Sequence, residues 1–275
     1  MGISPIQYRP WKGARSAQNL RVYVILRSVF KHGLKSTGVK ILLILGVFFV
    51  FSFQLTSVVF SPHERLEADE MRSNLDAIVL GIFAVLLAAV VTSDLISEDL
   101  SSNSFVLYFS RALKARDYLA GKAVGALLIM SLMCAIPPLL IAVIGTVTQS
   151  GDDYWYSLKV IGRTALAGAL ATVFFVPYGI MMSSFTRRKS YAAVGTFMSF
   201  FVLTIIASVF SEFASAPEWS VISPFDSLAF SFDWIFGVAL EPGVDKGALA
   251  AFLALFIIVP AVVVYVKITR QAVGK

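Results

Sequence analysis

Residues 247–266 read GALAAFLALFIIVPAVVVYV, an uncharged run of 20 residues bounded by Lys246 and Lys267. A helix of about 20 apolar residues crosses the roughly 30 Å hydrocarbon core of a bilayer, so this run predicts a transmembrane helix. The composition agrees, because 57% of the 275 residues are hydrophobic and only 15% are charged, whereas about 25% of the residues in a soluble domain are charged. A water-soluble fold is therefore excluded.

Five more uncharged runs precede this one, and they are 22, 17, 29, 23 and 22 residues long. Together the runs predict six spans, at 39–60, 75–97, 122–148, 160–185, 190–211 and 247–267. The connectors are too short to form a separate globular domain. We therefore expect an all-α polytopic membrane protein, a single transmembrane domain over 1–275 that works within the membrane and in contact with membrane lipids.

The charged residues alternate between the two sides of the predicted membrane. One side receives 18 of the 23 Lys and Arg residues and only 4 of the 17 Asp and Glu residues. Positive charge concentrates on the cytoplasmic side of membrane proteins, so both termini are expected in the cytoplasm. An even number of spans agrees, because it requires both termini to lie on the same side. The basic residues are dispersed rather than gathered around a stacking platform, and no nucleic-acid partner is expected.

Two segments outside the spans carry apolar surface. In the N-terminal segment 1–38, one helical arc is apolar and the opposite arc is basic, which predicts an interfacial amphipathic helix; the alternative is an ordinary basic flank of the first span. The apolar arc holds Val22, Ile25, Leu26, Val29 and Phe30, and the basic arc Arg21, Arg27, Lys31, His32 and Lys35. The external segment 212–246 is aromatic but too short to cross, and we expect re-entrant or interfacial helices there.

Prolines and small residues within the spans predict irregular helices and close packing. Span three contains Pro137 and Pro138, span four contains Pro177 and span six contains Pro260, and each can kink its helix. Span four also offers small residues for close approach of a neighbouring helix. They are Gly162, Gly168, Gly179, Ala165, Ala169 and Ala171.

Several kinds of chemistry have no residues to support them. The spans hold no intramembrane relay of ionisable residues, which disfavours a proton-coupled carrier. His32 and His63 both fall outside the spans, so a His-based zinc site or a Ser/His protease is not expected. Neither Gly-Lys pair, at 121–122 and 274–275, has the surroundings of a phosphate-binding loop. We expect no catalytic residue, metal site or cofactor in this chain.

The connector between spans two and three is the most informative segment, and residues 93–122 read SDLISEDLSSNSFVLYFSRALKARDYLAGK. Its runs ISEDL at 96–100, LY at 107–108, SR at 110–111 and DYLAGK at 117–122 resemble the connector of type-2 ABC transporter permeases. The run SPFD at 223–226 is also similar to that family's pattern before the last span. Ala112 departs from the family, whose members often have proline after the Ser-Arg pair.

The resemblance implies a six-span permease subunit of an exporter in a prokaryotic cell membrane. It implies two soluble ATPase subunits that bind ATP and Mg, and a second permease subunit in a homodimer or heterodimer. The connector 98–121 would dock on the ATPase as a coupling helix, through a mixed-charge surface with aromatic anchors. The candidate coupling residues are Glu98, Asp99, Phe105, Tyr108, Arg111, Lys114, Arg116, Asp117 and Tyr118.

Two other functions compete with the permease hypothesis. A membrane-embedded anchoring or assembly factor would use the same connector to hold a partner without transporting anything. A lipid-modifying enzyme would need clustered carboxylates, His or Cys near an interface, and the only dense cluster lies at 63–70. Because that cluster is more typical of a solvated loop than of a cation site, the enzyme ranks last. The sequence does not specify the substrate.

Overall fold

A computed structural model describes residues 19–60, 68–75, 77–109, 113–148, 154–214 and 217–272. Over these residues the chain is built from helices, with no strand. A helix satisfies its own backbone hydrogen bonds, which is the requirement that lipid imposes on an apolar segment. The prediction of an all-helical membrane fold is confirmed. Residues 63–67 of the acidic cluster lie outside the described residues. Residues 68–70 begin the helix α3 (Ala68–Asn74), so the predicted loop is wrong at that end of the cluster.

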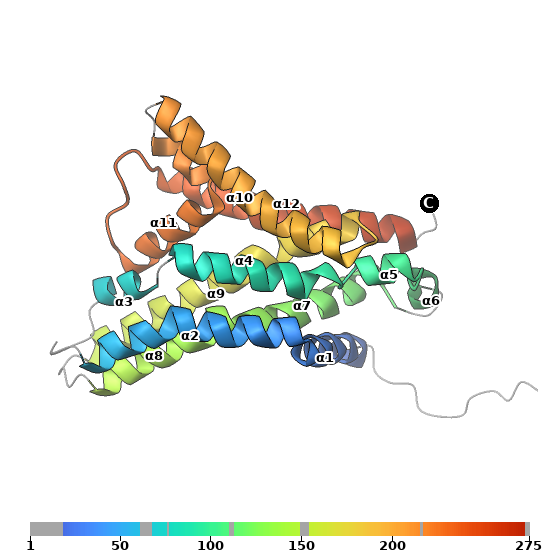
Figure 1. Cartoon of the computed structure of the whole chain (residues 1–275), viewed down its shortest axis with the longest axis horizontal. Coiled ribbons are helices and arrows are strands. Elements are labelled where there is room, and N and C mark those ends of the chain that lie inside the picture. The colour runs from blue at the N-terminus through green and yellow to red at the C-terminus, as the bar shows by residue number, and fades with distance from the viewer. Residues whose placement is uncertain are drawn as a thin grey trace, which may run out of the picture.

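Five helical segments are long and apolar enough to cross a membrane, and a sixth qualifies if the bent pair α1 and α2 is one span. The five segments are Val79–Ser101, Ala115–Val147, Tyr154–Phe185, Lys189–Ala214 and Lys246–Gln271. The long helices pack side by side as a bundle (Figure 1), and they are α2 (Thr37–Phe60), α4 (Ala77–Ser93), α7 (Ala115–Cys134), α8 (Ile136–Thr148), α9 (Tyr154–Phe185), α10 (Lys189–Ala214) and α12 (Lys246–Ala272).

The N-terminal helix α1 (Asn19–Lys35) is bent by 76° from α2. Its basic side, with Arg27, Lys31 and Lys35, is exposed, whereas the predicted apolar arc is half-buried against the bundle. The two helices separate at Ser36, where the helical pattern is interrupted. This geometry is compatible with an interfacial α1 followed by a spanning α2, a placement that stays a prediction.

Two glycines on α7 allow α1 to approach the α7 backbone closely. A Cβ at Gly121 would lie 2.8 Å from the Ile25 side chain and 3.1 Å from the Val22 carbonyl oxygen. One turn further, a Cβ at Gly125 would lie 2.7 Å from the Val29 side chain. Small residues four apart form such grooves in membrane helices. The contact between α1 and α7 therefore depends on the absence of two side chains.

The prolines act differently in different helices. Pro137 and Pro138 stand in the first turn of α8, directly after the break at Ala135 that ends α7. Two consecutive residues without N–H groups cannot continue the α7 hydrogen-bond ladder, which explains the break. Pro177 and Pro260 instead lie inside the continuous helices α9 and α12, so neither divides its helix.

Only some of the glycines of α9 lie in close contacts between helices. A Cβ at Gly168 would lie 2.8 Å from the Cα of Ala135, and one at Gly179 would meet the Thr92 side chain. Both positions therefore favour glycine for a close helix contact. Gly162 has nothing within 4 Å, so the expectation of close packing is wrong at that position.

The segment 212–246, predicted to be external, contains a short 3-10 helix, η1 (Pro217–Ile222), and the helix α11 (Pro224–Phe236). Buried Phe and Leu side chains hold α11 in the core. Asp233 of α11 pairs with Arg72 of α3 (Ala68–Asn74). Arg163 of α9 donates to the Phe236 carbonyl at 2.6 Å, next to Gly237, which ends the helix at φ 82°. Two arginines therefore hold α11 against α3 and α9.

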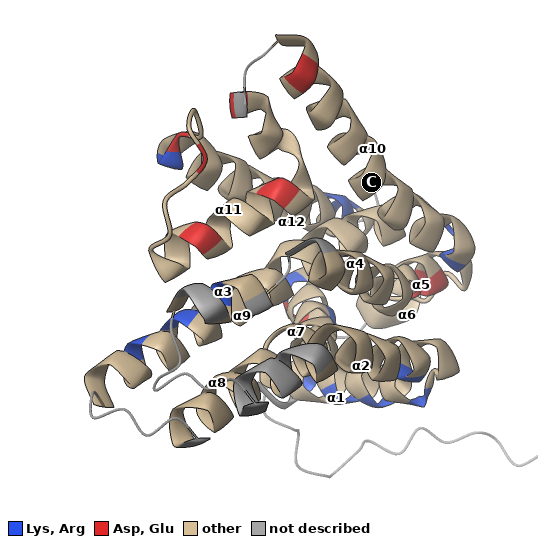
Figure 2. Ribbon diagram, turned by 60° about the vertical axis from the view of Figure 1, so that its left-hand side comes forward, with Lys and Arg blue, Asp and Glu red and all other residues tan. Residues whose placement is uncertain are grey.

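The connector and the C-terminus lie at one end of the bundle, and α3 and α11 lie at the other (Figure 1). The connector contains α5 (Ser97–Ser101) and α6 (Phe105–Phe109), and α1 is at the same end. Figure 2 shows Lys and Arg along α1 and acidic residues on α11 and at the far end of α10. The separation of basic and acidic residues that the sequence predicted is therefore visible between α1 and α11.

Candidate functional site in the connector

The connector begins at a helix break that another helix stabilises. α4 ends at Ser93 and α5 starts at Ser97. The hydroxyl of Ser183, near the end of α9, accepts bonds from the backbone N–H groups of Ile96 and Ser97, both at 3.1 Å, and donates to the Ser93 carbonyl at 2.9 Å. Ser183 is fully buried. One side chain of α9 therefore satisfies three polar groups of the break and fixes α5 in place.

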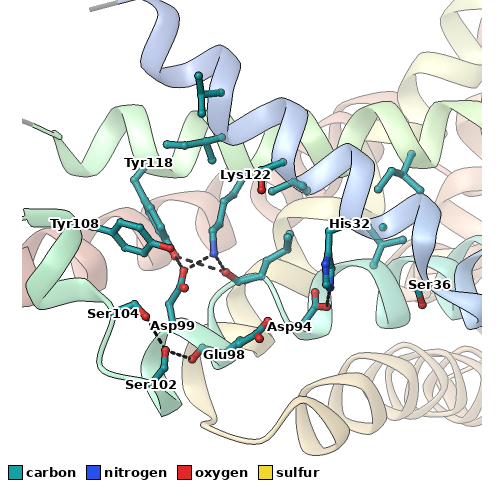
Figure 3. A pocket seen from close by; sticks show the side chains of 18 of the residues that line it. His32, Ser36, Asp94, Glu98, Asp99, Ser102, Ser104, Tyr108, Tyr118 and Lys122 are labelled. Carbon is teal, nitrogen blue, oxygen red and sulfur yellow. Dashed lines mark hydrogen bonds and ion pairs between the residues drawn. The ribbon is translucent and has the colours of Figure 1, made fainter.

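A buried ion pair fixes α5 to α7 as well. Lys122 of α7 donates both to the Asp99 carboxylate and to the backbone carbonyl of Leu95. The Tyr118 hydroxyl donates to the same Asp99 oxygen. The side chains of Lys122 and Asp99 are only 12% and 10% exposed. Charges buried to this degree need their partners, so this network holds α5 in one position relative to α7 (Figure 3).

An aromatic cluster joins α6 to the same part of α7. The ring of Tyr118 lies 5.6 Å from Phe105, 5.7 Å from Tyr108 and 6.0 Å from Phe109, measured between centroids. Aromatic rings at such separations attract one another beyond the effect of the area that they bury. Partial burial and the Asp99 carboxylate raise the pKa of the Tyr108 phenol above its ordinary value. Both short connector helices are thus anchored on Tyr118.

The candidate coupling residues predicted from the sequence fall into a buried group and an exposed group. Three of them, Asp99, Phe105 and Tyr118, are buried within the chain. The exposed ones are Glu98, Tyr108, Lys114 and Arg116, with Asp117 partly exposed beside Arg116 at 3.5 Å between Nε and the carboxylate oxygen. Arg111 lies outside the described residues. The predicted coupling set therefore consists of an internal network and an exposed surface.

Sequence reasoning missed the roles of Lys122 and Ser183. In the sequence, Lys122 is interpreted only as one of the many cations that set the topology. Its position at the end of the DYLAGK run, one helical turn after Tyr118, is the signal that could have identified it. Nothing in the sequence distinguishes Ser183 from the other serines of the spans. Their partners on α5 are 23 and 86 residues away in sequence, so only the packing of the bundle brings them together.

A cavity of about 1250 Å³ opens between α1, the end of α4 with α5, and the start of α7. Carboxylates of Asp94, Glu98 and Asp99 line one wall, and His32 faces Asp94 from α1, with 3.8 Å between the ring nitrogen and the carboxylate oxygen (Figure 3). Among the described residues, no three His, Cys, Asp or Glu side chains gather in a way that could hold a metal ion.

The fold and this site define a polytopic α-helical membrane protein whose connector is tied into the bundle by buried polar contacts. The model of the ABC-2 family transporter proteins matches residues 40–273, and the chain belongs to that family. It is a membrane subunit of the permease type, as the connector motifs implied. A search of curated proteins finds no match to the sequence.

Proposed function

We propose that this chain is the membrane subunit of an ATP-driven exporter, powered by ATP that a separate ATPase subunit binds with Mg and hydrolyses. Membership of the ABC-2 family supports a transport subunit and an association with an ABC ATPase in general. A second permease subunit, identical or related, completes the transporter in this proposal. Both termini and the connector then lie in the cytoplasm of a prokaryotic cell, on the side where ATP is hydrolysed.

The observation that carries the proposal is the internal fixing of the connector. α5 is bonded to α7 through Asp99 and Lys122, and to α9 through Ser183. A displacement of α5 therefore acts on two spans at once, because buried polar groups that lose their partners are costly. A loop that merely lay on the membrane surface would not need these contacts.

In this proposal the connector residues have two separate tasks. The exposed side chains Glu98, Tyr108, Lys114 and Arg116 contact the ATPase, and polar rims of this kind set specificity and orientation. The buried network then transmits the movement of the ATPase to the bundle. Asp99, Phe105 and Tyr118 belong to this second group because their side chains are buried.

The test separates docking from transmission. The chain is co-expressed with the ABC ATPase that co-purifies with it, and two quantities are measured: association, and the change in ATP hydrolysis when the membrane subunit joins the ATPase. Glu98→Lys combined with Arg116→Glu should abolish association. Lys122→Met should leave association intact and remove the change in hydrolysis. Glu241→Gln, an exposed residue of the external segment, serves as the control.

The outcomes decide between the hypotheses. If no ATPase associates with the chain, the proposed function is wrong. If an ATPase associates but its hydrolysis never responds to the membrane subunit, the chain behaves as an anchoring factor, an alternative that the family assignment does not favour. If both variants behave like the control, the connector is not the coupling element.

A further inference from the structure

The cavity between α1 and the connector has the size and lining of a ligand site. Its volume of about 1250 Å³ exceeds the roughly 300–1,000 Å³ of typical small-molecule sites. Its apolar wall comes from α1, α4 and α7, and includes Val24, Val90, Val91 and Ile129. The position of α1 in this wall is well defined, because α1 packs closely against α7 at Gly121 and Gly125.

The polar wall of the cavity carries the three carboxylates of Asp94, Glu98 and Asp99 and the two cationic side chains of Arg21 and Lys122. Asp94 and Glu98 are four residues apart and lie on the cavity side of the α4–α5 break (Figure 3). Lys122 also reaches the cavity, but its charge is already engaged by Asp99. Arg21 lines the cavity as well, and His32 is the group that faces Asp94. Carboxylates in such a wall attract a cationic group and repel the phosphate of a lipid headgroup.

An aromatic side chain stands beside the third carboxylate, that of Asp99. Tyr108 lines the same cavity, is 38% exposed and lies close to Asp99. An aromatic face next to acidic side chains is the arrangement that binds organic ammonium groups, because the ring quadrupole adds to the Coulomb attraction. The ring of Tyr118 already faces Lys122, with 4.8 Å between the ammonium nitrogen and the ring centroid. Tyr108 and Tyr23, which also lines the cavity and is 55% exposed, are therefore the aromatic groups that a ligand can use.

We propose that this cavity binds a hydrophobic organic cation. The charge of the cation lies at Asp94 and Glu98, and its apolar body lies along the apolar wall of the cavity. The binding needs no ATPase, but Glu98 and Tyr108 also belong to the proposed docking surface, so two other residues tell the proposals apart. Asp94→Asn should weaken cation binding and leave ATPase association unchanged, whereas Arg116→Glu, which is outside the cavity lining, should weaken association and leave cation binding unchanged.

The probe is radiolabelled tetraphenylphosphonium, measured by equilibrium binding to the full chain in nanodiscs of zwitterionic lipid. Binding to protein-free nanodiscs is subtracted. We expect saturable binding that weakens by about tenfold or more in Asp94→Asn combined with Glu98→Gln, the effect of removing both carboxylates from the cavity wall. Glu212→Gln combined with Glu218→Gln removes the same charge from exposed external positions and should bind like the unaltered chain. Tetraphenylborate, the anion of matched shape, should show no saturable binding.

A second variant covers the case in which the double substitution fails to fold, as judged by its helical circular dichroism. Val24→Trp fills the cavity from its exposed edge and leaves every carboxylate in place, and it should also reduce binding. Equal binding to protein-free nanodiscs overturns the proposal, as does unchanged binding in a folded double variant. Saturable binding of tetraphenylborate in preference to the phosphonium would instead identify an anion or lipid-headgroup site and overturn it too.

Discussion

Replacing Lys122 with methionine should destabilise the protein far more than the loss of an ordinary lysine. The substitution leaves Asp99, whose side chain is 10% exposed, with Tyr118 as its remaining donor on α7 and removes the bond to the Leu95 carbonyl. Breaking a buried ion pair on one side typically costs about 3–5 kcal/mol. Because Tyr118 continues to donate to the carboxylate, we expect the lower end, about 3 kcal/mol.

A double-mutant cycle tests the reasoning. Lys122→Met combined with Asp99→Asn removes both charges, and it should recover most of the stability lost by Lys122→Met alone. The assay is reversible unfolding in mixed micelles with increasing sodium dodecyl sulfate, followed by circular dichroism. The matched control is a cycle on Arg116 and Asp117, whose side chains are 68% and 24% exposed, and whose coupling should be at most about 1 kcal/mol. Additive effects at Lys122 and Asp99 would refute the internal network.

Three further predictions concern how the connector and its neighbours are held. Gly125→Val inserts a side chain where α1 packs closely against α7, and should destabilise the protein by about 1–3 kcal/mol in the same assay. Gly162→Val, with open space around it, should not. Ser183→Ala should speed hydrogen exchange at the amides of Ile96 and Ser97, measured by mass spectrometry, because two N–H groups lose their acceptor; Ser208→Ala, on an exposed face, should leave them unchanged. Gly237→Ala should lower stability by about 1 kcal/mol, since φ is 82° there; an unchanged unfolding midpoint would show that the C-cap of α11 adapts.

Much of the architecture could be predicted from the sequence because lipid leaves an apolar segment few alternatives. An uncharged run such as 247–266 must hydrogen-bond internally, so its composition alone predicts a spanning helix. The pair Pro137 and Pro138 correctly indicated an irregular span, because missing N–H groups act locally. Pro177 did not divide its helix, since neighbouring helices can accommodate a single proline in a bundle.

The connector shows where sequence reasoning stopped being sufficient. Its motifs made it recognisable, but which of its charged and aromatic residues face outward depends on partners far away in the chain. Asp99 turns inward because Lys122 is there, and the amides at the start of α5 turn inward because Ser183 is there. Local composition and residue order are enough to establish the membrane class, the helices and the family resemblance. The burial of particular connector residues follows only from the three-dimensional packing, because it is set by contacts between helices that are distant in sequence.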